Sequence, residues 1–141
     1  MPTVDINIVA LLAATAVNMV VGYIWYSKSV LGTAWQKLVG LSDKDIKNAD
    51  QVTPMVAMVI LAFLQAFVLL HFVTYAAYFY PDYSDVSVGL ITGVWAWLGF
   101  VLPAVGGAYL FAQRRKKLLA IDTLYTLTVL GINGILLAVL R

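Results

Sequence analysis

The sequence contains no cysteine and no glutamate, and its 141 residues include a single histidine. Without cysteine the chain can form no disulfide, thiolate nucleophile, palmitoyl anchor or sulfur-ligated metal site. Because glutamate is missing, every acidic role falls on seven aspartates. Charged residues make up 11% of the chain and hydrophobic residues 62%, which nearly inverts the proportions of a soluble domain. The composition therefore predicts that lipid surrounds most of this protein.

Four long apolar runs occupy almost the whole chain. They cover residues 4–26, 53–80, 86–112 and 118–140. Each exceeds the roughly 20 residues that a helix needs to cross the hydrocarbon core of a bilayer. The first run has no basic segment before it and continues past a signal-peptide length, so we expect it to be retained. These runs predict an all-α, integral membrane four-helix bundle, with residues 1–141 as a single domain and 27–52 as its long loop.

The cations gather in two of the three connections between these runs. The turn at 81–85 carries only Asp82 and Asp85. The cations of the other two connections are Lys28, Lys37, Lys44, Lys47, Arg114, Arg115, Lys116 and Lys117. Basic loops stay in the cytoplasm, so we expect both to be cytoplasmic and both termini to lie outside a plasma or inner cell membrane. This placement of charge gives no reason to expect nucleic acid as a partner.

The loop at 27–52 carries signals for two short helices. Residues 33–39 can form an interfacial helix that Gly40 ends. Ser42 is a plausible N-cap, with Asp45 three residues later in a capping box, so a second helix through Ala49 is expected.

Small residues recur at helical spacing in several spans. Ala10, Ala14, Asn18 and Gly22 follow one another every four residues in the first span. The third and fourth spans show the same four-residue spacing of small residues, at Gly89 and Gly93 and at Gly134 and Ala138. Such ridges let helix backbones approach closely, and we interpret them as packing within the bundle, with a dimerisation face as the alternative. Pro103 predicts a kink in the third span.

Polar side chains within the spans can be sorted by depth, because each helical residue rises 1.5 Å. Asn18 and Gln65 fall within roughly 5 Å of the midplane, where they can bond between two spans. A polar cavity at mid-depth is the alternative interpretation.

His71 and Thr92 lie roughly 10 Å towards the termini side, with Asn133 somewhat deeper on the same side. A histidine inside a span can titrate near neutral pH or bind a metal or cofactor. No second histidine, cysteine or acid lies at that level, so we expect no metal site and no cofactor there. We favour a neutral His71 bonded to Asn133 or to a tyrosine.

Asp122 is the one acid well inside an apolar run, roughly 10 Å from the midplane on the basic-loop side. It can pair with a neighbouring cation or reach the interface as an acid in the first turns of its helix. Alternatively, Tyr23, Tyr26 and Ser27 reach the same level and would form a polar pocket with it that opens to the cytoplasm. Asp122 and these three residues are the candidate ligand site.

Several short segments resemble one known family. Residues 22–27 (GYIWYS), 31–35 (LGTAW) and Gly40 are similar to the opening of small four-helix membrane proteins catalogued as domain of unknown function 1761. Leu31 replaces an aromatic residue of that pattern. The second half also fits, through 97–100 (WLGF), the basic turn at 114–115 and a tyrosine-bearing last span, although Asp122 stands where a small polar residue is common. The resemblance implies a topology and no catalytic residue.

Two functions remain open at this stage. The first is a non-enzymatic packing or accessory component of a membrane assembly, with lipids, other copies of the chain or a larger complex as partners. The lack of a set of residues that could act together in catalysis supports this function. His71 and Asp122 lie some 20 Å apart in depth and cannot share a catalytic site. The second is a small-ligand or ion carrier or channel, formed as an oligomer, with Asn18, Gln65 and Asp122 along its path.

Overall fold

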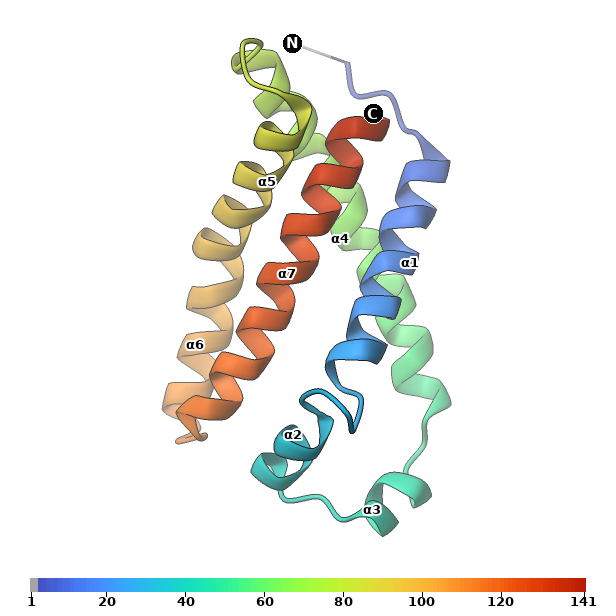
Figure 1. Cartoon of the computed structure of the whole chain (residues 1–141), viewed down its shortest axis with the longest axis vertical. Coiled ribbons are helices and arrows are strands. Elements are labelled where there is room, and N and C mark those ends of the chain that lie inside the picture. The colour runs from blue at the N-terminus through green and yellow to red at the C-terminus, as the bar shows by residue number, and fades with distance from the viewer. Residues whose placement is uncertain (1–2) are drawn as a thin grey trace.

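The computed structural model describes residues 3–141, and over this part of the chain all regular structure is helical (Figure 1). The elements are α1 (Ile8–Trp25), α2 (Gly32–Val39), α3 (Asp43–Asn48), α4 (Val52–Phe79), α5 (Asp85–Ala96), the π-helix η1 (Trp97–Val101), α6 (Leu102–Phe111) and α7 (Lys116–Leu140). Helices α1, α4 and α7 and the continuous run α5–η1–α6 are each long and apolar enough to cross a membrane. The predicted all-α class and the four apolar spans are therefore confirmed.

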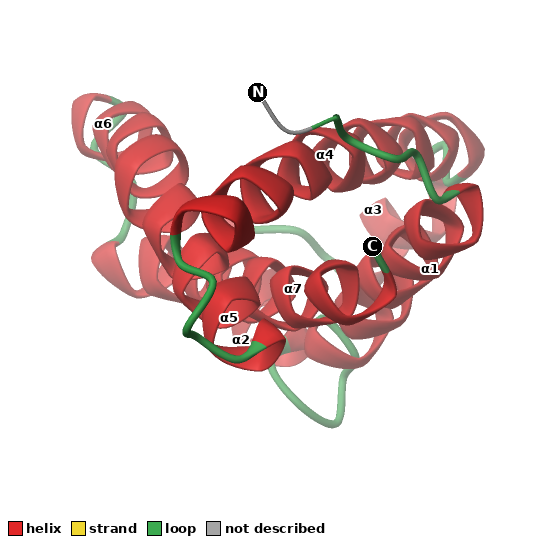
Figure 2. Cartoon of the chain, turned by 90° about the horizontal axis from the view of Figure 1, so that it is seen from above, coloured by secondary structure: helices red, strands yellow, loops and turns green. Residues whose placement is uncertain are grey.

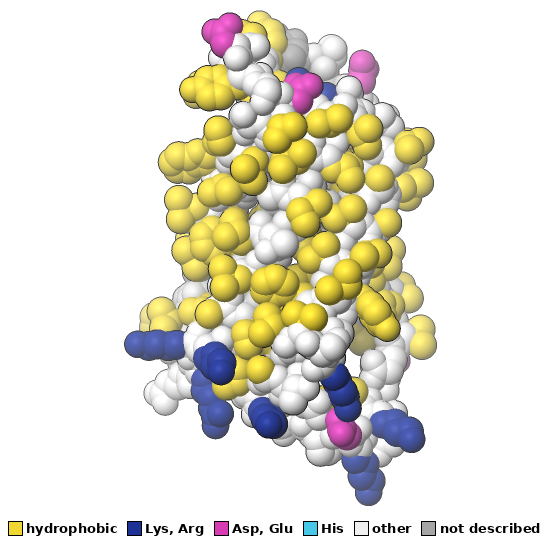
Figure 3. Space-filling view, in the orientation of Figure 1, with side chains coloured by type: hydrophobic (Ala, Val, Ile, Leu, Met, Phe, Trp, Pro, Cys, Tyr) yellow, Lys and Arg dark blue, Asp and Glu magenta, His cyan; other side chains and the backbone are white. Residues whose placement is uncertain are grey.

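Helix α7 lies between α1 and α5 (Figure 2) and contacts the other three spans. Residues near both ends of the chain meet at one end of the molecule, where Asn7 donates a hydrogen bond to the Leu140 carbonyl at 2.7 Å. Arg141 pairs there with Asp85 at 2.7 Å. Lysines and arginines gather at the opposite end, below a broad apolar belt (Figure 3). The separation of charge expected from the sequence is thus present along the bundle axis.

The first helix is shorter than the apolar run that predicts it. The run begins at Val4, but α1 begins at Ile8 because the Asn7 side chain caps it by accepting from the Ala10 amide at 3.1 Å. The other spans follow their apolar runs to within about two residues, as helix ends usually do.

The small-residue ridges pack inside the chain. Ala10 and Ala14 are fully buried, and Asn18 is 5% exposed. Between α5 and α7 the backbones touch, because a Cβ on Gly89 would collide with the Gly134 carbonyl. Within the described chain the ridges therefore hold the bundle together, in agreement with the packing interpretation.

The third span changes its winding before Pro103. Residues Trp97–Val101 form a π-helix, in which the Leu102 amide bonds back to the Trp97 carbonyl. Proline has no amide hydrogen, so Pro103 cannot donate the backbone bond that an α-helix makes to the residue four positions before it. The wider π-turn, whose bonds run to the residue five positions before, accommodates this missing donor. The irregularity expected at Pro103 thus lies in the turn before it.

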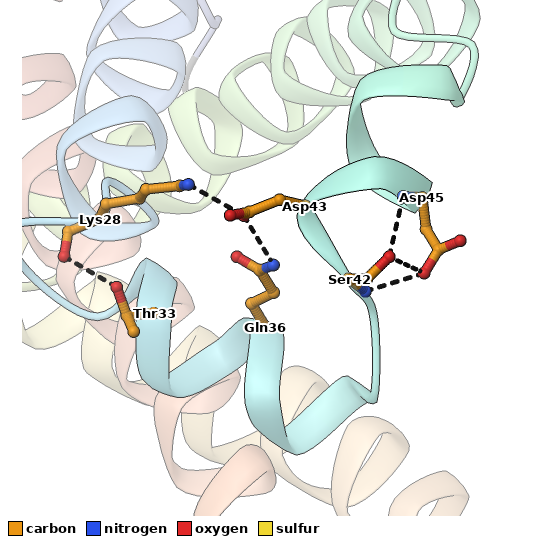
Figure 4. Close-up of polar contacts among 6 residues, drawn as sticks. All are labelled: Lys28, Thr33, Gln36, Ser42, Asp43 and Asp45. Carbon is orange, nitrogen blue, oxygen red and sulfur yellow. Dashed lines mark hydrogen bonds and ion pairs between the residues drawn. The ribbon is translucent and has the colours of Figure 1, made fainter.

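The loop helices form where the sequence places them. Gly40 ends α2 with a left-handed φ of 81°. Ser42 and Asp45 form the complete capping box at the start of α3 (Figure 4). The loop at 27–52 is therefore folded, and its two helices lie at the lower end of the bundle in Figure 1.

Candidate functional site

Asp122 is held by phenols from two other segments. Tyr26, directly after α1, donates to Oδ1 at 2.7 Å, and Tyr109 of α6 donates to Oδ2 at 2.5 Å. Both are hydrogen bonds to an ionisable acceptor, the strong class when the carboxylate is charged. Between residues 3 and 141 the ion pairs are Lys28–Asp43 and Arg141–Asp85, so Asp122 takes part in neither. The carboxylate is therefore stabilised by neutral donors and keeps lone pairs for a further partner.

A cavity of about 730 Å³ opens beside this carboxylate. Aromatic rings form much of its wall: the Tyr26 ring packs edge to face with Tyr125 and with Trp35, at 5.3 and 5.8 Å between centroids. Tyr109 adds a fourth ring. The cavity thus combines one acid with several π faces.

Gly32 allows this aromatic wall to close. A Cβ at Gly32 would overlap the backbone carbonyl of Tyr26, and the Gly32 amide donates to Ser27 at 2.8 Å. The chain can therefore double back tightly after α1, and α2 brings the Trp35 ring against Tyr26.

The long loop covers the cavity from the basic end. Lys28, Gln36 and Ile46 line it, and both Lys28 and Gln36 bond to Asp43, at 2.9 and 3.0 Å (Figure 4). The hydrogen bond from Gln36, followed by the bond and charge of Lys28, lowers the pKa of Asp43 below its ordinary value. Because the Lys28–Asp43 pair is largely exposed, water reaches this side of the cavity.

Two tryptophans fix the turn of α7 that carries Asp122. Trp25 of α1 donates its indole hydrogen to the Ile121 carbonyl at 3.1 Å, and Trp97 of η1 donates to the Thr123 carbonyl at 2.8 Å. These carbonyls flank Asp122 in the sequence. The position of the carboxylate is thus set from two sides by packed aromatic side chains.

A second polar group lies deeper, between α1, α4 and α7. Asn18 donates to Gln65 at 3.0 Å, the contact that their equal depth predicts. The Asn18 side-chain oxygen Oδ1 in turn accepts from the Tyr125 hydroxyl at 2.8 Å. Asn18 is buried, so the group acts as a hydrogen-bonded link between three spans.

Comparison with known proteins identifies the family. The family model described as "Protein of unknown function (DUF1761)" matches residues 9–138, nearly the whole chain. The chain belongs to this family. No curated protein and no solved structure matches it. Family membership therefore agrees with the resemblance seen in the sequence and brings no activity with it.

Two of the residues predicted beside Asp122 lie elsewhere. Tyr23 is 83% exposed and is not among the residues that line the cavity. The Ser27 hydroxyl donates to the Ile24 carbonyl at 2.7 Å, because serine at a helix end bonds readily to the preceding turn. Sequence position gives the expected level of a side chain along the bundle axis but cannot say which way that side chain points.

The polar residues on the termini side do not form one cluster. His71 Nδ1 lies 2.8 Å from the Phe67 carbonyl of its own helix, and among residues 3–141 His71 bonds neither to Asn133 nor to a tyrosine, the two partners expected. Asn133 donates to the Ala14 carbonyl at 3.1 Å, and its buried Oδ1 meets no donor within the described chain. Thr92 lines a separate cavity beside α4. Among residues 3–141 no group of three potential ligands could hold a metal ion.

Sequence reasoning missed Tyr109 as a partner of Asp122. Tyr109 stands five residues before Arg114, and Asp122 stands five residues after Lys117. Two antiparallel helices joined by a tight turn bring such symmetric positions together. Counting equal numbers of residues in both directions from the basic turn could therefore have identified the pair.

Proposed function

We propose that this protein is a non-enzymatic multi-pass membrane protein that binds a small organic cation in the cavity around Asp122. The observation that carries the proposal is the carboxylate itself, which two phenols hold in place beside a wall of aromatic rings. The family and the four apolar spans support the membrane setting.

The chemistry of the wall favours a cation over an anion or a sugar. Aromatic faces carry negative electrostatic potential and attract ammonium groups, by about 0.5 to 1 kcal/mol at sites that water reaches and about 2 kcal/mol or more where water is excluded. Tyr26, Trp35 and Tyr125 line the cavity with such rings, and the carboxyl group of Asp122 lies among them. The Lys28 ammonium at the rim is already paired with Asp43, so it leaves the acid free to attract a ligand cation.

The size of the cavity fits a small ligand. Its volume of about 730 Å³ lies within the range of roughly 300 to 1,000 Å³ that is typical of small-molecule sites. An amine or quaternary ammonium compound can enter from the loop side, where Lys28 and Asp43 are exposed.

The positive-inside rule supports a cytoplasmic mouth for this cavity. Lysines and arginines gather at one end of the bundle (Figure 3), and one of them, Lys28, lines the Asp122 cavity, whereas residues near both termini lie at the other end (Figure 1). We place the termini outside and the loops inside a cell membrane on this ground. A reporter enzyme fused after Arg141 tests the orientation, because activity confined to the cytoplasm would contradict it.

An accessory role in a larger assembly is a weaker candidate. Small-residue ridges are common docking surfaces for partner helices, but here Gly89 and Gly93 already contact the backbone of α7. The described ridges therefore give no particular reason to expect a partner on them.

Binding of tetramethylammonium to the purified protein tests the proposal. We expect saturable quenching or enhancement of tryptophan fluorescence, because Trp35 lines the cavity. Asp122→Asn should weaken binding at least about tenfold, which corresponds to roughly 1.4 kcal/mol. Asp82→Asn, in the exposed turn at the other end, is the matched control and should bind as the wild type does. Equal binding by both variants, or no saturable signal, would contradict the proposal.

A further inference from the structure

A second cavity lies on the membrane-facing side of the bundle, between α4 and the third span. It has a volume of about 460 Å³ and continues into a deeper one of about 270 Å³. Both are lined by Phe72 of α4 and by Ala96 and Phe100 of the third span, which join them into one groove. The groove is separate from the Asp122 cavity, which shares none of these residues.

The lining of the groove is apolar along almost its whole length. Its mouth near the termini end is framed by Tyr80 and Tyr83, and its inner end reaches Gln65 and Leu130. Phe72 and Phe100 stack across it, with centroids 6.1 Å apart, where the two cavities meet. Tyrosines at the mouth suit the headgroup level of a bilayer, and the apolar interior suits hydrocarbon.

The groove follows the depth of one leaflet. From Gln65 to Tyr80 the helix rises about 22 Å, and tilt shortens this along the membrane normal. One leaflet with its headgroup region is about 20 to 22 Å thick, half of the 40 to 45 Å of a whole bilayer. The groove therefore extends from the interface to near the midplane, as a lipid tail does.

The length of the groove favours a lipid tail over a partner helix. A helix that crosses the membrane would pack along the whole depth of the hydrocarbon core, whereas the groove ends near the midplane, at Gln65 and Leu130.

We propose that one acyl chain of a membrane lipid from the termini-side leaflet occupies this groove as a defined site. The chain enters beside the packed rings of Tyr80 and Tyr83 and runs past Phe72 and Phe100 towards Gln65. The lipid fills the space between α4 and the third span that the protein's own side chains leave open.

Quenching by a phospholipid with brominated acyl chains tests the proposal, because Trp95 lines the groove and is 66% exposed. The lipid is added back to the full-length protein purified in detergent. We expect saturable quenching at about one lipid per protein, a loss of most of that signal in Trp95→Phe, and one retained lipid in native mass spectrometry.

Groove-filling variants separate this site from ordinary surrounding lipid. Ala96→Phe blocks the point where the two cavities meet, and Ala76→Phe blocks only the outer one, in case the first variant does not fold. Either should abolish the saturable phase. Leu98→Phe is the control, since Leu98 is exposed in η1 and lines neither cavity.

Two outcomes would overturn the proposal. Quenching that rises in proportion to lipid and is equal in all variants would show surrounding lipid only. A dimer that Ala96→Phe converts to a monomer would show that a second copy of the chain, and not a lipid, occupies the groove.

Discussion

The two halves of the third span meet α7 in opposite ways. On α5, a Cβ added at Gly89 or Gly93 would collide with the backbone carbonyl of Gly134 or Leu130. On α6, a Cβ added at Gly106 or Gly107 would find no atom within 4 Å. One continuous span is therefore packed tightly against its neighbour in one half and loosely in the other.

The division falls at the π-helix. Trp97–Val101 winds more widely, and after it α6 carries Tyr109 to Asp122 across an open cavity and not through backbone contact. We infer that the α5 half specifies the fold, whereas the α6 half leaves room for a ligand. The four predictions below test this division of roles.

The tight half should tolerate no added side-chain atom. Gly93→Ala forces a methyl group against the Leu130 carbonyl, which is backbone and cannot turn aside. We expect the free energy of unfolding to fall by about 2 to 3 kcal/mol, as in other overpacked interiors. Chemical unfolding in detergent measures it. Unchanged stability would show that α5 and α7 are not in backbone contact.

Removing the Asp122 carboxylate should have the next largest effect. Asp122→Ala leaves the hydroxyls of Tyr26 and Tyr109 without their acceptor, and we expect a loss of about 1 to 2 kcal/mol. Asp122→Asn keeps one acceptor oxygen and should cost about 1 kcal/mol or less. The same unfolding experiment compares them. Equal stability of Asp122→Ala and the wild type would show that the two phenol bonds contribute nothing to the fold.

Features with a local cause were predicted well from the sequence. The spans follow from apolar run length, and the start of α3 follows from Ser42 and Asp45, whose bonds need only neighbouring residues. Depth also paired Asn18 with Gln65, because two equally deep amides in adjacent spans can reach each other.

Features that depend on helix rotation were not predicted. Tyr23 and Tyr26 differ in depth by about one helical turn, some 4.5 Å, yet Tyr26 reaches Asp122 and Tyr23 is exposed. His71 likewise bonds within its own helix and not to Asn133. Hydrophobic periodicity cannot supply this information here, because a membrane helix is apolar on every side and its rotation is set by packing.

The loose half should gain stability from the substitution that harms the tight half. Gly107→Ala adds a methyl group where no atom lies within 4 Å and removes the conformational freedom of glycine in a helix. We expect an increase of roughly 0.5 to 1 kcal/mol in the free energy of unfolding. It is the matched control for Gly93→Ala in the same unfolding experiment. A loss of stability similar to that of Gly93→Ala would mean that α6 is packed as tightly as α5.

We expect the smallest of the four effects, a shift in the pKa of Asp43, in the loop that covers the Asp122 cavity. Hydrogen bonds from Gln36 and then Lys28 lower the pKa of Asp43, so the folded loop binds a proton less readily than the unfolded loop. The stabilisation is therefore complete above the ordinary value of 3.8 and is lost as the pH falls through the lowered one. Gln36→Ala removes the first of these bonds and should raise the pKa of Asp43, so that the contact is lost at a higher pH.

Carboxyl carbon NMR of the labelled aspartates measures this shift directly. Asp45 is the internal control, since its pKa is lowered by the side chain and backbone of Ser42, which the Gln36→Ala change does not touch. We expect the Asp43 titration to move and the Asp45 titration to stay. If Asp43 titrates identically in the variant, then Gln36 does not hold α3 against α2, and the cavity around Asp122 lacks the covering that its loop side requires.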